Sequence, residues 1–163
     1  MSVSAGMCMA DAGLVSVYRP ITELKHPLAR KAMAFWDSRP ADGLELGRDV
    51  PSRAIADLLK RIIVHEPIEG GRDLKVRLAG SAIRQRFGRE ITGANLSQLY
   101  PTPDLADRLR SVMTAIEEGR PQCADCALTG GFTEVVHTEL VIMPVFAPNR
   151  VAAWAMTFCC FFG

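Results

Sequence analysis

Residues 151–162 form the longest apolar run in the chain, and this run constrains the possible folds most strongly. It contains Thr157 and is shorter than the roughly 20 residues of a membrane-spanning helix, so we interpret it as a β-strand. Both of its faces are apolar: Val151, Ala153, Ala155, Cys159 and Phe161 lie on one, and Trp154, Met156, Phe158 and Phe162 on the other. An antiparallel strand usually exposes one face to water. We therefore expect the second face to be covered by an amphipathic helix that carries Phe35 and Trp36, or by a partner subunit.

The order of helix and strand patterns along the chain is typical of an α+β fold. Apolar residues at helical spacing predict helices at 27–39, 81–87 and 102–118, and alternating or β-branched runs predict strands at 61–68, 74–79, 122–129, 132–146 and 150–162. Asp49 is expected to cap one further short helix, with Pro51 in its first turn. The pattern predicts one antiparallel sheet with helices on one face. It divides the chain into a flexible segment (1–25), N-terminal helices for dimerisation or signalling (26–60) and a core (61–163).

Composition and charge exclude several classes of protein. An apolar share of 48% and a charged share of 23% are those of a globular chain. The net charge of +1 comes from basic and acidic residues that are interspersed, which gives no basic stripe for nucleic acid. The N-terminal residues do not resemble a secretory signal, so we expect a cytoplasmic protein with its five cysteines reduced and no membrane contact.

Few residues in the sequence suggest chemistry. Cys123 and Cys126 form a CxxC, but residues three apart on a strand point to opposite faces, which disfavours a shared metal or a redox role. His137 and Glu139 share a face and could hold a proton, a metal or a polar ligand, although a solvated sheet face explains them equally well. His65 follows the β-branched start of a strand, and we expect it at the surface. Because no catalytic constellation is visible, we expect that the protein is not an enzyme.

A motif in the middle of the chain carries a resemblance to a known family. It consists of Val76–Ser81, Phe87–Glu90, Thr92-Gly93 and Asn95-Leu96. Together with the upstream Trp36, Arg39 and Arg48-Asp49, it resembles a PAS-like domain family common in alphaproteobacteria. The resemblance implies a PAS fold, in which a five-stranded antiparallel sheet and its helices enclose a pocket. It gives structural roles to Arg77, Gly80, Gly88 and Gly93, and we expect Arg77 to pair with Glu90 or Asp73.

The resemblance also bears on cofactors. Flavin-binding PAS photosensors carry a reactive cysteine after the Asn of this motif, where the present chain has Leu96. Haem-binding PAS sensors commonly take their iron ligand from the long helix, and residues 102–118 contain no histidine. Flavin and haem are therefore disfavoured and no cofactor is expected, although His65 or His137 could in principle bind iron.

The function implied by the resemblance is that of a bacterial single-domain sensor or regulatory module. It would bind a small apolar ligand or a partner protein, and would signal through protein contacts; a histidine kinase is one possible partner. The expected pocket lining is Phe87, Leu99, Tyr100, Met113, Val136, Leu140, Trp154 and Met156. Phe35 and Trp36 are the candidate homodimer interface. The alternative is an adaptor protein whose pocket is filled by its own side chains.

Overall fold

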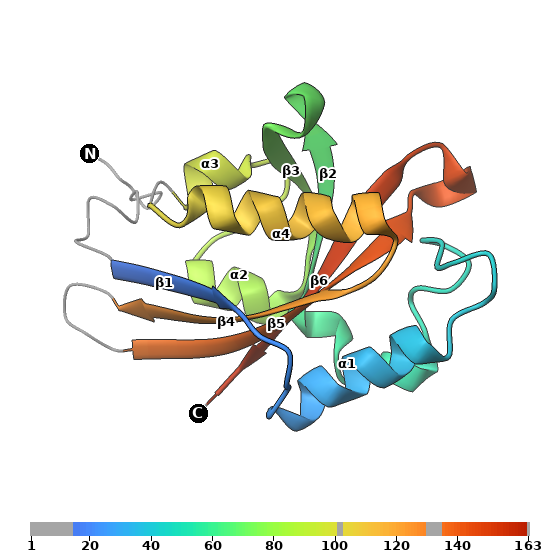
Figure 1. Ribbon diagram of the computed structural model, residues 1–163, viewed down its shortest axis with the longest axis horizontal. Helices are drawn as coiled ribbons and strands as arrows, with labels where there is room; N and C mark the ends of the chain where they lie inside the picture. The colour runs from blue at the N-terminus through green and yellow to red at the C-terminus, as the bar shows by residue number, and fades with distance from the viewer. Residues whose placement is uncertain (1–14, 101–102, 130–134, 163) are drawn as a thin grey trace.

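The computed structural model describes residues 15–100, 103–129 and 135–162, and its centre is one antiparallel sheet (Figure 1). The strands run in the order β1-β4-β5-β6-β2-β3. Their bounds are β1 Val15–Pro20, β2 Ile62–Ile68, β3 Asp73–Ala79, β4 Gln122–Thr129, β5 Val135–Phe146 and β6 Ala153–Phe161. The α+β prediction is confirmed, and β4 has the bounds that the sequence predicted. The beginning of the predicted strand 132–146 lies outside the described residues.

The sheet has six strands instead of the expected five. The additional strand is β1, which lies in the segment 1–25 that was predicted to be flexible. It pairs with β4 along its whole length, from Val15 opposite Thr129 to Pro20 opposite Ala124. The prediction was wrong here because only a short alternation precedes Pro20, too little to identify a strand without its partner.

Within the described residues, four α-helices accompany the sheet: α1 (Pro27–Asp37), α2 (Ser81–Phe87), α3 (Leu96–Leu99) and α4 (Leu105–Glu118). α4 ends at Gly119, which adopts the left-handed conformation with φ of 69°. In place of the short helix predicted after Asp49, the structure has a 3₁₀ turn at Arg53–Ile55, capped by the Ser52 side chain, and a second 3₁₀ turn at Leu59–Arg61. Asp49 has another role, because its carboxylate accepts a hydrogen bond of 2.8 Å from the Glu45 backbone N–H.

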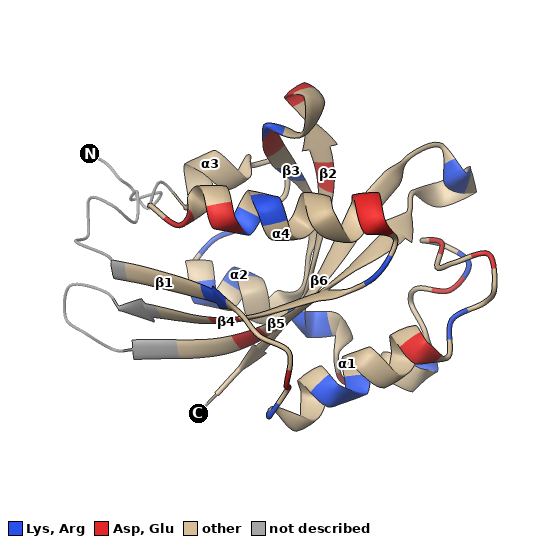
Figure 2. Ribbon diagram, in the orientation of Figure 1, with Lys and Arg blue, Asp and Glu red and all other residues tan. Residues whose placement is uncertain are grey.

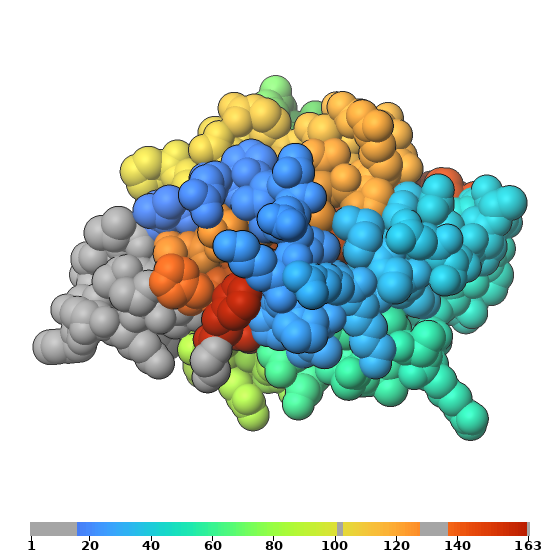
Figure 3. Space-filling view, turned by 60° about the horizontal axis from the view of Figure 1, so that its bottom comes forward, coloured from blue at the N-terminus to red at the C-terminus, as the bar shows by residue number. Residues whose placement is uncertain are grey.

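The chain's own α1 covers the second apolar face of β6. Trp36 is 7% exposed and Phe158 is fully buried, and both belong to one apolar cluster between α1 and the sheet. Figure 3 shows α1 and the segment leading into it as a continuous blue-to-cyan layer over this side of the molecule. Trp36 therefore stabilises its own subunit and leaves little surface for a partner. Phe35 is only partly buried, so its role at a dimer interface stays a prediction.

The N-terminal end of α1 is fixed to the sheet by a buried carboxylate. Glu139 on β5 is 3% exposed. It accepts hydrogen bonds from the backbone N–H groups of Lys25 (3.0 Å) and His26 (2.8 Å). The His26 ring caps the helix, since its Nδ1 accepts from the Leu28 N–H at 3.1 Å. Every polar group in this anchor has a partner, as buried polar groups require.

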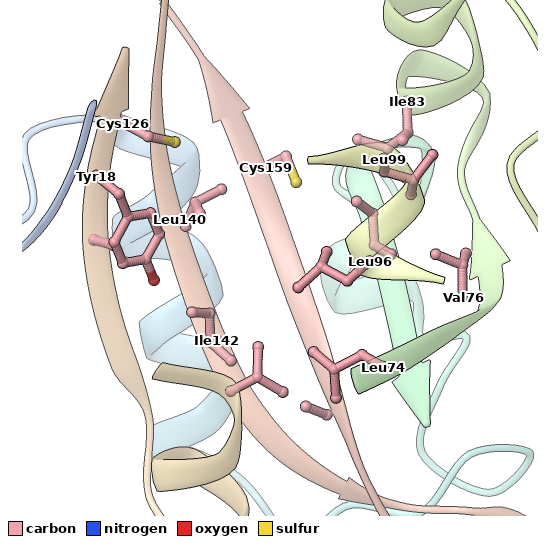
Figure 4. Packing of buried hydrophobic residues seen from close by; sticks show 14 of the residues in the cluster. Tyr18, Leu74, Val76, Ile83, Leu96, Leu99, Cys126, Leu140, Ile142 and Cys159 are labelled. Atoms are coloured by element: carbon pink, nitrogen blue, oxygen red, sulfur yellow. The ribbon is translucent and has the colours of Figure 1, made fainter. Parts of the chain in front are cut away.

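A second apolar cluster fills the space between the opposite face of the sheet and α2, α3 and α4. Figure 4 shows Tyr18, Leu140 and Ile142 on one side of this space and Leu96 and Leu99 on the other, with Cys159 between them. Among the described residues, no helix combines the length and the apolar character needed to cross a membrane.

Candidate functional site

A small cavity of about 40 Å³ lies within this second cluster, between the sheet and α4. Its floor comes from three neighbouring strands, its roof from α3, α4 and the residue after α3, and one side from β1. The lining residues are Tyr18, Ile63, His65, Leu96, Tyr100, Arg108, Val112, Leu140, Ile142, Thr157 and Cys159. Most of the lining is apolar, with a few polar groups among it, a composition typical of sites for small ligands.

His65 and Thr157 form the polar part of the floor. In the β2–β6 ladder, Ile63 pairs with Thr157 and His65 with Ala155, so the two polar side chains lie on the same face, one step apart. They are 5% and 4% exposed. Within the described part of the chain, neither the two ring nitrogens of His65 nor the Thr157 Oγ1 has a hydrogen-bond partner. Leaving such a group unpaired costs about 1–3 kcal/mol, so the cavity provides a place for a hydrogen-bonding molecule.

The protonation state of His65 follows from its burial. Burial lowers the pKa of the imidazole to about 4. The ring is therefore neutral at pH 7 and carries one N–H donor and one nitrogen acceptor. A molecule in the cavity can accept a hydrogen bond from the protonated ring nitrogen and donate one to the other ring nitrogen. The Thr157 hydroxyl can act as donor or as acceptor.

Arg108 brings a positive charge to the roof, but that charge is already neutralised. Its Nε donates to Asp104 at 2.9 Å, and Nη2 donates to the Ser16 hydroxyl at 3.2 Å. The guanidinium lies 4.1 Å from the centroid of the Tyr100 ring. Burial raises the pKa of Tyr18 to about 12 and also raises that of Tyr100, so both phenols stay protonated. The roof is an ordered polar wall without net charge.

Comparison with known families identifies this architecture. A family model for the PAS domain matches residues 24–155. The chain belongs to the PAS domain family. A search of curated protein sequences found no match. Family membership indicates a sensor or signalling module, and PAS domains are generally not enzymes and commonly mediate contacts between proteins.

The cavity of this PAS domain contains only part of the predicted lining. Tyr100 and Leu140 line it. Phe87, Leu99 and Met113 belong to the same apolar cluster but lie outside the cavity wall. The side chain of Val136 lies outside the described residues.

Trp154 and Met156 were assigned to the wrong face of the sheet. Both belong to the apolar cluster under α1. The register explains the error, because Leu140 pairs with Cys159 whereas Met156 pairs with Met143. Side chains alternate along a strand, so Cys159, Thr157 and Ala155 accompany Leu140, and the even-numbered residues of β6 face α1.

His65 and Thr157 were missed for different reasons. His65 was predicted to lie at the surface, but its side chain points to the face of the sheet that α3 and α4 cover, where it lines the cavity with Leu96 and Val112. Thr157 is the one hydroxyl residue in an apolar run, and its alternation with Ala155 and Cys159 could have marked it. The alternation was visible in the sequence, but the sequence did not show which helix covers that face of the sheet.

The structure does not bring the other residues considered for metal binding or redox chemistry together into a site. Cys123 and Cys126 belong to different apolar clusters on opposite faces, as the strand spacing predicted. Burial raises the pKa of Cys123 to about 11 and also raises that of Cys126, which keeps both thiols protonated. His137 is exposed, while Glu139 anchors α1. Across the described ranges, no group of three or more His, Cys, Asp or Glu side chains is arranged to hold a metal ion.

The family motif has its own structural roles. Arg77 donates to Glu66 at 3.4 Å and not to Glu90 or Asp73, so the predicted partner was wrong. Glu90 instead accepts from Arg84 and Thr92, and Asp73 accepts from Ser97.

The three motif glycines have structural roles that involve the backbone alone. A Cβ at Gly80 would clash with the backbone of Leu59 and Lys60, so this site requires glycine. Gly88 ends α2 with φ of 72°, in the left-handed conformation. The Gly93 N–H donates to the Val76 carbonyl at 2.7 Å.

Proposed function

We propose that this PAS domain is a sensor whose cavity binds a small, polar, uncharged molecule and whose output passes through contacts with other proteins. The observation that carries the proposal is the pair of buried polar side chains, His65 and Thr157, whose hydrogen-bonding atoms have no partner among the described residues. A fold stabilised only by packing would gain from apolar residues at both positions.

The cavity's chemistry limits the ligand class. Neutral His65 offers one donor and one acceptor, and Arg108 already has Asp104 as its counter-ion. An uncharged ligand with both donor and acceptor atoms complements these groups, whereas an apolar ligand would leave them unpaired. A volume of about 40 Å³ supports a ligand of few atoms over a flavin or a haem.

A route from the cavity to the surface runs through β6. Thr157 faces the cavity, while its neighbours Met156 and Phe158 pack under α1. A ligand that prefers one position of this strand would shift the equilibrium between two positions of α1. We infer that α1, with the partly buried Phe35, presents the signal to a second copy of the chain or to a signalling partner such as a histidine kinase.

Native mass spectrometry of freshly purified protein tests the proposal. The wild-type protein should retain a small co-purifying mass, and His65→Leu should lose it. Met156→Leu is the matched control, because it conserves volume on the same sheet but on the opposite face. Retention of the same mass by His65→Leu would contradict the assignment of the cavity as the binding site.

One observation favours a second candidate, the adaptor without a ligand. Phe87, Leu99 and Met113, which were expected to line a pocket, pack instead into the apolar cluster. In this alternative the cavity holds only ordered water, which can bridge buried polar groups. A wild-type protein with no bound mass would support the adaptor and overturn the sensor.

A further inference from the structure

A second hollow, of about 620 Å³, lies on the outer surface where the turn before β2 meets the beginning of α2. Its lining residues are Lys60, Arg61, Ser81, Ala82, Gln85, Arg86 and Phe161. Three of these side chains are cations and none is acidic. Figure 2 shows basic residues both on α2 and on the turn that precedes β2.

Several basic residues on the surface are paired with an acid: Arg84 contacts Glu90 at 3.2 Å, Arg19 contacts Asp125 at 2.8 Å and Lys31 contacts Asp57 at 2.8 Å. Within the described residues, Lys60, Arg61 and Arg86 have no acidic partner within ion-pair distance. In addition, the Arg61 Nε is buried without a hydrogen-bond acceptor in that part of the chain. The positive charge of the hollow is therefore available to a ligand.

The hollow is held by tightly packed backbone. Gly80 approaches Lys60 so closely that no side chain fits, and its N–H donates to the Ile62 carbonyl at 2.9 Å. On the other side, the Arg86 guanidinium lies 4.7 Å from the centroid of the Phe161 ring. The Phe161 ring limits where Arg86 can lie, so less conformational entropy is lost when Arg86 binds an anion.

We propose that this hollow, lined by Lys60, Arg61 and Arg86, is a docking site for an acidic segment of a partner protein. Charge complementarity is the main argument: three cations without internal partners surround a space that is too large for one carboxylate. Guanidinium groups bind carboxylates through two parallel hydrogen bonds, which suits a segment with several Asp or Glu side chains. The site goes beyond the sensor proposal, since it involves no residue of the cavity.

Fluorescence anisotropy with a labelled hexaglutamate peptide tests the site in buffer of about 0.1 M salt, where the Debye length is about 10 Å. We expect the double variant Lys60→Gln with Arg86→Gln to weaken binding by about tenfold or more, because two charge-assisted contacts are lost. The matched control is Arg72→Gln with Lys75→Gln, which removes the same charge at the far end of the β2–β3 hairpin. It should change the affinity less than about twofold, since surface charges separated by more than a Debye length are screened.

Three results would overturn the proposal. An equal loss in the control pair would show a general attraction of the protein for anions. Unchanged binding by the Lys60 and Arg86 double variant would exclude the hollow. A hexadeoxynucleotide that binds the wild type as tightly as the peptide would contradict a protein segment as the occupant. Because His65→Leu should bind the peptide like wild type, failure of this site and failure of the sensor proposal are distinguishable.

Discussion

The two faces of the sheet differ in how they treat buried polar groups. Under α1, the buried Glu139 carboxylate is satisfied by backbone N–H groups, and Val141, Met143, Met156 and Phe158 belong to one apolar cluster. Among the described residues, the Trp154 Nε1 on this face is an exception, because it is buried without a hydrogen-bond partner. Under α4, His65 and Thr157 are as deeply buried and have no partner within the described chain. We interpret the α1 face as the one that stabilises the fold, and the α4 face as one that gives up stability for the proposed binding site.

The largest expected effect is on the α1 face. Phe158→Ala should lower the free energy of unfolding by about 3–5 kcal/mol, because the fully buried ring leaves a cavity. Urea denaturation measures the change. Phe161→Ala, on the partly exposed end of the same strand, is the control and should cost clearly less. A Phe158→Ala loss under about 1 kcal/mol would show that this face is not tightly packed.

The second prediction concerns pH and the α4 face. Folded His65 has a pKa of about 4, while the unfolded chain titrates near the ordinary 6.5. Between these values the unfolded state binds more protons, so the free energy of unfolding falls as the pH is lowered from 6.5 to 4, by about 3 kcal/mol in total. Denaturation of wild type and His65→Leu across this range isolates the contribution. Parallel pH profiles for the two proteins would contradict a buried, neutral His65.

A smaller loss is expected when the satisfied carboxylate is changed. Glu139→Gln should cost about 2 kcal/mol, because an amide replaces a charged acceptor of N–H groups from Lys25 and His26. Hydrogen exchange should then be faster in the first turn of α1 than in α4. Unchanged protection of that turn would mean that Glu139 does not anchor the helix.

The smallest effect separates the two faces most cleanly. Thr157→Val should change the stability by less than about 1 kcal/mol, or raise it, since the lost hydroxyl has no partner in the described structure. The reverse change on the α1 face, Val141→Thr, buries a new hydroxyl and should cost about 1–3 kcal/mol. Thermal unfolding of the two isosteric variants gives the comparison, and equal losses would show that the faces do not differ.

The sequence predicted the fold better than the site. Local signals placed α1, α2 and β4, because Pro27, Gly88 and the spacing of apolar residues act within a few positions. The sequence analysis did not predict β1, because this strand is stabilised by pairing with β4, more than one hundred residues away. The site was harder, since deciding whether Met156 or Thr157 faces the cavity requires knowing which helix covers which face.

The most direct test of the account is the electron density of the cavity in a high-resolution crystal structure of the purified protein. We expect a molecule other than water within hydrogen-bond distance of a ring nitrogen of His65 and of the Thr157 hydroxyl. Ordered water alone at these atoms, or a cavity closed by a rearranged His65, would contradict the claim that the α4 face is kept for a ligand.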